Sequence, residues 1–315
     1  MQIESARRRL RLRDLETLVA VVQSGGMRKA ATQLHLSQPA VSKAIAELEN
    51  TLGMKLLERS RRGVQPTAFG AALVRRSEAL VDGVRGALRE LVEMADPEAG
   101  EVRLGSMETL HAGVVGATAV ALLDQHPRIR LVFESGQAPD LIRHFLMGRL
   151  VDFVVARPYE PTLPPEIRAE PLFHDRLLIV VGQTHALARK RKVDLLDLQG
   201  ENWILSRNEI QPESPVVQAL KTHGLELPRQ IIVSGGLALR YTLLSTGRFV
   251  TCIPHSLMPY VRPVSGLKVL PIRLTPWHTA TMIMTLHGRE PTPAAELFLA
   301  MLRERALALV EPTLD

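Results

Sequence analysis

The chain has 315 residues, of which 46% are apolar and 23% are charged, a balance typical of a soluble protein large enough to bury more than one core. No apolar run approaches the ~20 residues that cross a bilayer, and no apolar signal core follows the basic N-terminus, so we expect a cytoplasmic protein. The single cysteine, Cys252, excludes an internal disulfide and a cysteine-based metal cluster.

The positive charge is concentrated in the first fifth of the chain. Residues 1–67 hold twelve Lys and Arg against six Asp and Glu, a formal charge of +6 that equals the charge of the whole chain. The remainder is therefore neutral overall. This distribution predicts a nucleic-acid-binding head on a neutral body. A solvated basic tail is the alternative, but it would account only for the run Arg7-Arg8-Arg9.

Three helices are predicted in the head, with a tight turn between the last two. Residues 12–23 carry apolar side chains on one face and end at a Gly-Gly pair. Residues 27–52 form two short helices, because their apolar residues recur at helical spacing. Ser37 is suited to cap the second of these, and Pro39 stands in its first turn, where a missing N–H costs nothing. The pattern indicates a helix-turn-helix, whose second helix presents its N-terminal end to the DNA major groove.

Candidate base-reading residues surround that helix end. Gln38 can pair with the adenine edge and Lys43 can donate to guanine. Ser42 faces the same groove and can serve a base or a phosphate, and Pro39 can contact a thymine methyl group. An ordinary solvated helix face is the alternative interpretation of these side chains.

Residues 56–67 are two short extended runs around a basic turn that contains glycine, a pattern that predicts a β-hairpin wing. Basic side chains on the wing and on the helix before the turn are expected to contact the phosphate backbone or a minor groove, which adds affinity with little sequence information. They are Arg28, Lys29, Arg59, Arg61 and Arg62.

Residues 68–94 are predicted to form one helix about 40 Å long. Its apolar positions are Phe69, Leu73, Leu80, Val84, Leu88 and Leu91. A long helix with one apolar stripe and no neighbour in sequence indicates self-pairing across a dimer. A bent or partly buried helix is the alternative, because Gly83 and Gly86 weaken the pattern. A break at 96–100 marks a domain boundary.

From residue 101 onward, short apolar strands alternate with helices, which predicts a mainly parallel, doubly wound α/β body with two lobes. Ligands bind such sheets beyond the carboxyl ends of the strands. Residues expected there are Ser106, Met107, Glu108, Ser135, Gly136, Gln137, Arg157, Ser206, Arg207, Gly235 and Gly236. Their hydroxyls, backbone amides and arginines favour a small anionic metabolite, a carboxylate or a sulfonate. Glu108 argues against an anion, because an acid in the first turn of a helix competes with an anion for the same helix end. The alternative interpretation of each residue is an ordinary helix cap or turn without a ligand.

Catalytic and metal-binding patterns are not found in the sequence. The histidines are scattered singly, so no metal site and no cofactor are predicted. Cys252 lies in an apolar strand and is expected to be an inert core residue. No nucleophile elbow, phosphate loop or metalloprotease motif occurs, so we do not expect an enzyme.

Short motifs in both halves of the chain recur in one known family. In the head they are Lys29-Ala30-Ala31, the run from Leu36 to Ser42, Leu56-Leu57-Glu58-Arg59 and the run from Pro66 to Gly70; in the body they are the runs from Gly148 to Asp152, from His185 to Ala188 and from Phe249 to Pro254. By these motifs the chain resembles the LysR-type transcriptional regulators of bacteria over essentially its whole length.

The resemblance implies an α+β multidomain fold: a winged helix-turn-helix at 1–67, a linker and dimerisation helix at 68–98, and an effector-binding domain at 99–315. That domain would have two Rossmann-like lobes of the periplasmic-binding-protein kind, with lobe I at 99–165 and 266–315 and lobe II at 166–265. Members commonly assemble as homodimers that pair into homotetramers, bind promoter DNA and respond to a small-molecule effector between the lobes. An α/β enzyme with a helical head and an architectural DNA-binding protein without an effector remain the alternatives.

Overall fold

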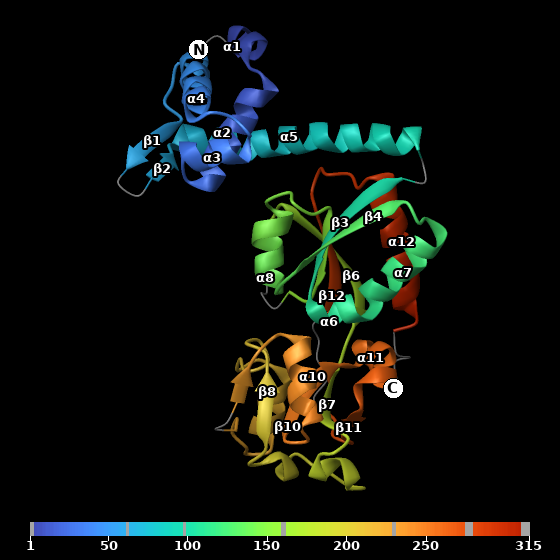
Figure 1. Ribbon diagram of the computed structural model, residues 1–315. Coiled ribbons are helices and arrows are strands. Elements are labelled where there is room, and N and C mark those ends of the chain that lie inside the picture. Colours follow the sequence, from blue (N-terminus) through green and yellow to red (C-terminus); the bar gives the residue numbers. More distant parts are fainter. Residues whose placement is uncertain are drawn as a thin grey trace. The chain divides into compact units, whose positions relative to one another are not determined.

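The computed structural model describes residues 3–60, 63–96, 99–158, 162–228, 231–274 and 280–309 (Figure 1). The chain divides into two compact units, Met1–Leu91 and Val92–Asp315. No helix in the ranges described is both long and apolar enough to span a membrane.

The first unit is mainly helical. Its elements are α1 (Ile3–Arg9), α2 (Leu12–Ser24), α3 (Met27–Gln33), α4 (Gln38–Leu52), β1 (Leu57–Ser60), β2 (Gly63–Pro66) and the start of α5 (Ala68–Ala95). The predicted limits of α2, α4 and α5 agree with these to within two residues, whereas α1 was not predicted. Leu18 and Val21 of α2, Ala30 of α3, and Val41 and Ile45 of α4 meet in one core.

The predicted wing is present as an antiparallel pair, with Leu57 opposite Pro66 and Ser60 opposite Gly63. Its second strand is held against the turn between α2 and α3, because the Val64 N–H donates to the Gly25 carbonyl at 3.2 Å. The wing and the helix-turn-helix therefore form one body.

The second unit contains two five-stranded sheets, each with its own hydrophobic core. The first sheet has the order β4-β3-β5-β12-β6 and the second has the order β11-β7-β10-β8-β9. We call them, with their helices, the first and second lobes. The strands of the first are β3 (Gly100–Ser106), β4 (Ile129–Ser135), β5 (Phe153–Ala156), β6 (Ile167–His174) and β12 (Ala280–Leu286). Those of the second are β7 (Leu177–Gly182), β8 (Asn202–Leu205), β9 (Ile231–Val233), β10 (Phe249–Pro254) and β11 (Leu267–Val269).

Helices cover both sheets. The first lobe has α6 (Glu108–Leu110), η1 (His111–Val115), α7 (Gly116–Gln125), α8 (Ala138–Asp140), η2 (Leu141–Leu146) and α12 (Pro293–Leu307). The second has η3 (Ala186–Arg189), η4 (Leu196–Leu198), α9 (Pro215–Thr222), α10 (Leu237–Ser245), η5 (His255–Leu257) and α11 (Met258–Ser265). The helical segment that follows β3 is divided into α6, η1 and α7, and Gly113 within it, at φ −115° and ψ −125°, is not helical.

The sheets differ from the prediction in direction. In the first, β4, β3 and β5 are parallel, but β12 runs antiparallel to both β5 and β6. In the second, β9, β8 and β10 are parallel, but β7 runs antiparallel to β10 and β11. The expectation of a mainly parallel sheet was therefore wrong: β12 in the first lobe and β7 in the second, each the first strand after the chain crosses between the lobes, run against the βα units.

Two strands belong to the other lobe than the one predicted from the sequence. β6 begins after the limit at 165/166, yet it completes the first sheet, and β11 begins after the limit at 265/266, yet it edges the second sheet. The expected architecture is otherwise confirmed, with an N-terminal helix-turn-helix, a long α5 and two α/β lobes.

Candidate functional site

The turn before α4 exposes the start of that helix. Ser37 has extended backbone angles, and its Oγ accepts a hydrogen bond from the Ala40 N–H at 3.3 Å, as the capping pattern predicted. Pro39 stands in the first turn. Gln38 and Pro39 are exposed. The first turn of α4 is therefore rigid in its backbone and open to a partner.

The other predicted base-reading residues follow one turn later. Ser42 is half-buried and Lys43 is exposed. Positions four apart lie on one helix face, so Ser42 stands beside Gln38 and Lys43 stands beside Pro39. Lys43 Nζ lies 3.8 Å from Glu47 Oε1, and because both side chains are exposed this pair holds the lysine only weakly. Lys43 can therefore turn toward another acceptor.

Other basic residues of the head lie on α3 and β1. Arg28 and Lys29 on α3 are exposed. Arg59 belongs to β1, where it stands opposite Val64. Arg61 and Arg62 lie outside the described residues. The structure thus describes the positions of three of the five predicted backbone contacts.

Glu49 of α4 is a structural residue of the head for which the sequence patterns predicted no contact. Only 7% of it is exposed. Its Oε1 accepts hydrogen bonds from the backbone N–H groups of Leu56 at 2.8 Å and Leu57 at 3.2 Å, and its Oε2 accepts from Lys55 Nζ at 2.6 Å. Burial alone would raise the pKa of Glu49, but these hydrogen bonds hold it below the usual value. The carboxylate joins the end of α4 to the start of the wing.

A close backbone contact completes this joint. An added Cβ at Gly70 would lie 1.9 Å from the carbonyl oxygen of Leu56, so only glycine lets α5 pass this close to the chain entering β1. Thr67 also binds there, because its Oγ1 donates to the Lys55 carbonyl at 2.8 Å and accepts from the Gly70 N–H at 3.0 Å. The wing is fixed at both ends.

In the body, two predicted effector residues bridge the lobes. Glu108 follows β3, and its Oε2 accepts a hydrogen bond from the N–H of Leu237, the first residue of α10, at 3.0 Å. Gln137 follows β4, and its Oε1 accepts from Asn208 Nδ2 at 3.4 Å. We call these four residues the lobe junction. α6 and α10, which begin at Glu108 and Leu237, belong to different lobes (Figure 1).

The glycines before α10 lie against this junction. An added Cβ at Gly235 would lie 2.9 Å from Gln137 Nε2, and one at Gly236 would lie 3.9 Å from Glu108 Oε2. The Gly236 N–H donates to Ser234 Oγ at 3.1 Å. The structure therefore brings together Glu108, Gln137, Gly235 and Gly236 of the predicted effector set.

Arg157 is held differently from the prediction. It is only 1% exposed, and its NH2 group donates to Asp175 Oδ2 at 2.7 Å. Its NH1 group donates to Thr109 Oγ1 at 3.3 Å, and Asp175 Oδ1 also accepts from the Ser256 N–H at 3.1 Å. Because a buried charge of this kind is costly to separate from its partner, Arg157 ties the lobes together instead of offering a free cation.

The remaining predicted residues occupy the ends of strands. Ser135 ends β4 and is exposed, and Gly136 follows it. Ser106 ends β3 and is fully buried, with no hydrogen-bond partner for its hydroxyl among the residues described. Met107 is buried, and its Sδ faces the Arg157 N–H at 3.5 Å. Arg207 follows β8 and is exposed, so it is a predicted cation that reaches solvent.

A second buried ion pair lies behind Ser206. The Ser206 N–H donates to Glu209 Oε2, which also accepts from Arg240 NH2 at 2.6 Å. Burial alone would lower the pKa of Arg240, but the charge of Glu209 raises it. Arg240 also donates to the Cys252 carbonyl at 2.7 Å. The pair positions α10 against β8 and β10, and no sequence motif pointed to it.

Cys252 is fully buried in β10. Burial, with the negative charge of Glu209, raises the pKa of its thiol well above the usual value, so the thiol is not activated. Within the described ranges, no group of three or more His, Cys, Asp or Glu side chains is placed to hold a metal ion.

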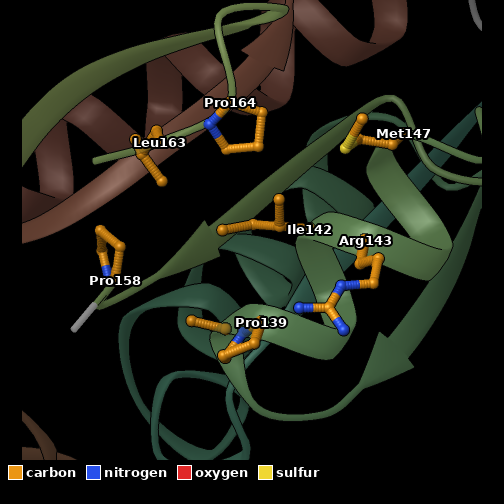
Figure 2. A pocket seen from close by; sticks show the side chains of 8 residues that line it. Pro139, Ile142, Arg143, Met147, Pro158, Leu163 and Pro164 are labelled. Carbon is orange, nitrogen blue, oxygen red and sulfur yellow. The ribbon is translucent and has the colours of Figure 1, made fainter. Parts of the chain in front are cut away.

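An apolar pocket of about 60 Å³ lies beside η2 of the first lobe (Figure 2). Pro139, Ile142, Leu163 and Pro164 line it, and Arg143 stands at its side. An engineered apolar cavity that admits benzene measures ~150 Å³. The pocket is therefore too small for a ring-sized metabolite and is not our candidate effector site.

Two family models match the chain. Residues 12–71 match the helix-turn-helix of bacterial regulatory proteins of the lysR family. Residues 95–307 match the LysR substrate binding domain. The two matches together cover the head and both lobes.

Whole-length relatives agree with these matches. The transcriptional regulator GbpR of Azospirillum brasilense is 26% identical over 97% of this chain and 91% of its own length. A cysteine variant of full-length OxyR from Pseudomonas aeruginosa superposes with a TM-score of 0.64 at 19% identity, covering 94% of each chain. CbnR in complex with its target DNA superposes with a TM-score of 0.60 at 19% identity, covering 94% of this chain and all of that one. At these identities the two structures show a shared fold.

Proposed function

This chain belongs to the LysR family of DNA-binding transcriptional regulators with an effector-binding domain, and from that premise we propose which of its residues read DNA and what kind of effector it senses. The family is one of regulators and not of enzymes. The alternative of an α/β enzyme with a helical head is therefore set aside.

We propose that the first turns of α4 enter the major groove and that Gln38, Ser42 and Lys43 contact base edges, with Pro39 against a thymine methyl group. The observation that carries this is the Ser37 cap, which leaves Gln38 and Lys43 exposed at a fixed helix end. Each good pair with a base edge discriminates by about 1–3 kcal/mol.

Phosphate contacts are assigned to the basic residues of α3 and the wing. They are Arg28, Lys29, Arg59, Arg61 and Arg62. Exposure of Arg28 and Lys29 supports this assignment, as does the Glu49 joint that sets the wing relative to α4. Such contacts give affinity that falls steeply with salt. Footprinting of the full-length chain on promoter duplexes tests both assignments, because base-specific protection is expected under α4 and backbone protection under the wing.

For the effector we propose a small carboxylate or sulfonate bound at the lobe junction. Support comes from the start of α10, where the N–H of Leu237 already donates to the Glu108 carboxylate, and from the exposed cation of Arg207. A thermal-shift screen of the full-length chain tests it. Anionic compounds should stabilise the protein and change its affinity for promoter duplex. Stabilisation by neutral or cationic compounds alone would reject the proposal. Affinity that no metabolite changes would favour an architectural DNA-binding protein.

We further propose a homodimer through α5 that assembles into a homotetramer. The predicted stripe on this helix is exposed at Leu80 (57%), Leu88 (58%) and Leu91 (61%) in the single chain. Exposed apolar side chains along 28 residues of helix are costly in water unless another surface covers them.

The domain limits proposed are 1–67 for the winged head, 68–98 for the linker and 99–315 for the effector-binding domain. The proposed location is the cytoplasm, where the DNA is.

A further inference from the structure

Hydrogen bonds between the two lobes hold the lobe junction together. Glu108 and Gln137 of the first lobe each accept a hydrogen bond from the second lobe, at 3.0 Å from the Leu237 N–H and at 3.4 Å from Asn208 Nδ2. Both acceptors follow strands whose ends were predicted to hold the effector. The polar groups that an effector would use are therefore already engaged with one another.

The stronger of the two contacts places a carboxylate on a helix N-terminus. α10 runs from Leu237 to Ser245, and its N-cap residue Gly236 contributes no side chain to cap it. The free N–H groups and the dipole of such an end stabilise a negative charge. A bond from a backbone N–H to a carboxylate is about twice as strong as one between neutral groups. The start of α10 thus holds an anion, and the other lobe supplies it.

A further hydroxyl of α10 lies in the field of that carboxylate. The Tyr241 hydroxyl is buried and has no hydrogen-bond partner within the described part of the chain. Burial, together with the charge of Glu108, raises its pKa, so it stays a neutral donor. Arg240, the next residue back, is turned to Glu209. A carboxylate that replaced Glu108 at the start of α10 would find the N–H of Leu237 and, on the same helix, a buried hydroxyl that no other described residue uses.

We propose that Glu108 is an internal ligand: it fills a carboxylate subsite at the start of α10 and holds the lobes together until an effector carboxylate replaces it. Two carboxylates so close together repel each other, so the exchange is competitive. Effector binding would then break a contact between the lobes and make a new one through the effector. This inference rests on the proposed effector function of the junction and names how that site is regulated.

The test uses the full-length chain with Glu108→Ala, Glu108→Gln and the control Glu213→Ala, which removes an exposed acid elsewhere in the second lobe. Backbone hydrogen exchange is measured over the start of α10, with sodium acetate as the probe and sodium chloride as the ionic control. In Glu108→Ala we expect exchange at Leu237 to accelerate about tenfold, because its acceptor is gone, and acetate to restore most of the protection. Glu108→Gln, which keeps a neutral acceptor, should fall between Glu108→Ala and the wild type.

In the wild type and in Glu213→Ala the subsite is filled, so acetate should change exchange by less than about twofold. Equal protection by acetate of the wild type and Glu108→Ala would overturn the proposal, as would unchanged exchange in Glu108→Ala. If Glu108→Ala does not fold, Glu108→Gln carries the same comparison.

The outcome for the effector function is separable. Acetate rescue of Glu108→Ala, combined with wild-type duplex binding that no carboxylate or sulfonate alters, would keep the subsite and reject the proposed effector. If an effector alters duplex binding but acetate fails to rescue Glu108→Ala, the proposed effector function is kept and the carboxylate subsite is rejected.

Discussion

Replacing Glu49 by Gln tests how α4 is joined to the wing. The change keeps the size of the side chain and one acceptor oxygen but removes the charge. Two backbone N–H groups, of Leu56 and Leu57, would then bond to a neutral acceptor instead of a carboxylate. Net values are about 1.5–3 kcal/mol for hydrogen bonds to charged groups and about 0.5–1.5 kcal/mol for neutral ones. The Lys55 side chain is 80% exposed, so its ion pair adds less than about 1 kcal/mol. We expect a loss of about 2 kcal/mol in the free energy of unfolding of the head.

The assay is urea unfolding of the full-length chain, followed by hydrogen exchange in the head, with Glu58→Gln as the control. Glu58 is an exposed acid on the same wing, so Glu58→Gln also removes one negative charge from the head. Because the folded pKa of Glu49 lies below its usual 4.5, the carboxylate stabilises the head fully above that pH and loses its effect as pH falls through the folded value. The gap between wild type and Glu49→Gln should therefore be widest near neutral pH and close in acid. A gap that is independent of pH, or no larger than that of Glu58→Gln, would refute this reasoning.

Three other substitutions test separate parts of the molecule. Lys29→Ala should weaken binding to all duplexes alike and lower the salt slope by about 1 in fluorescence anisotropy titrations; a loss confined to some sequences would contradict a phosphate contact. Arg157→Leu leaves the buried Asp175 without its cation and should cost about 3–5 kcal/mol in urea unfolding; near-normal stability would mean that the pair does not tie the lobes. Leu88→Glu should shift the proposed dimer toward monomer in sedimentation equilibrium, and an unchanged dissociation constant would place the pairing surface away from α5.

Local patterns predicted the head well, because its structure depends on neighbours in sequence. The Ser37 hydroxyl lies three residues before the Ala40 N–H that it caps, and Pro39 stands in the same first turn. The apolar spacing of α4 and α5 likewise located both helices to within two residues. These are effects of propensity and capping, which short windows contain.

Contacts between distant residues were not predictable in this way. Glu108 and Leu237 are 129 positions apart, and nothing near either residue identifies the other. Arg157 follows a strand at the expected place, but its partner Asp175 could not be identified from the sequence, so the buried ion pair was not predicted. The directions of β7 and β12 depend on how the chain passes between the lobes, which strand periodicity does not encode.

The most direct measurement is a selection of duplexes from a random-sequence pool by the full-length chain, repeated with Gln38→Ala. If the capped end of α4 reads bases, the wild type should enrich one two-fold-related site, and Gln38→Ala should enrich the same site with the preference at one position in each half-site relaxed by about 1–3 kcal/mol. Identical preferences from both proteins at every position would contradict base reading by this end of the helix.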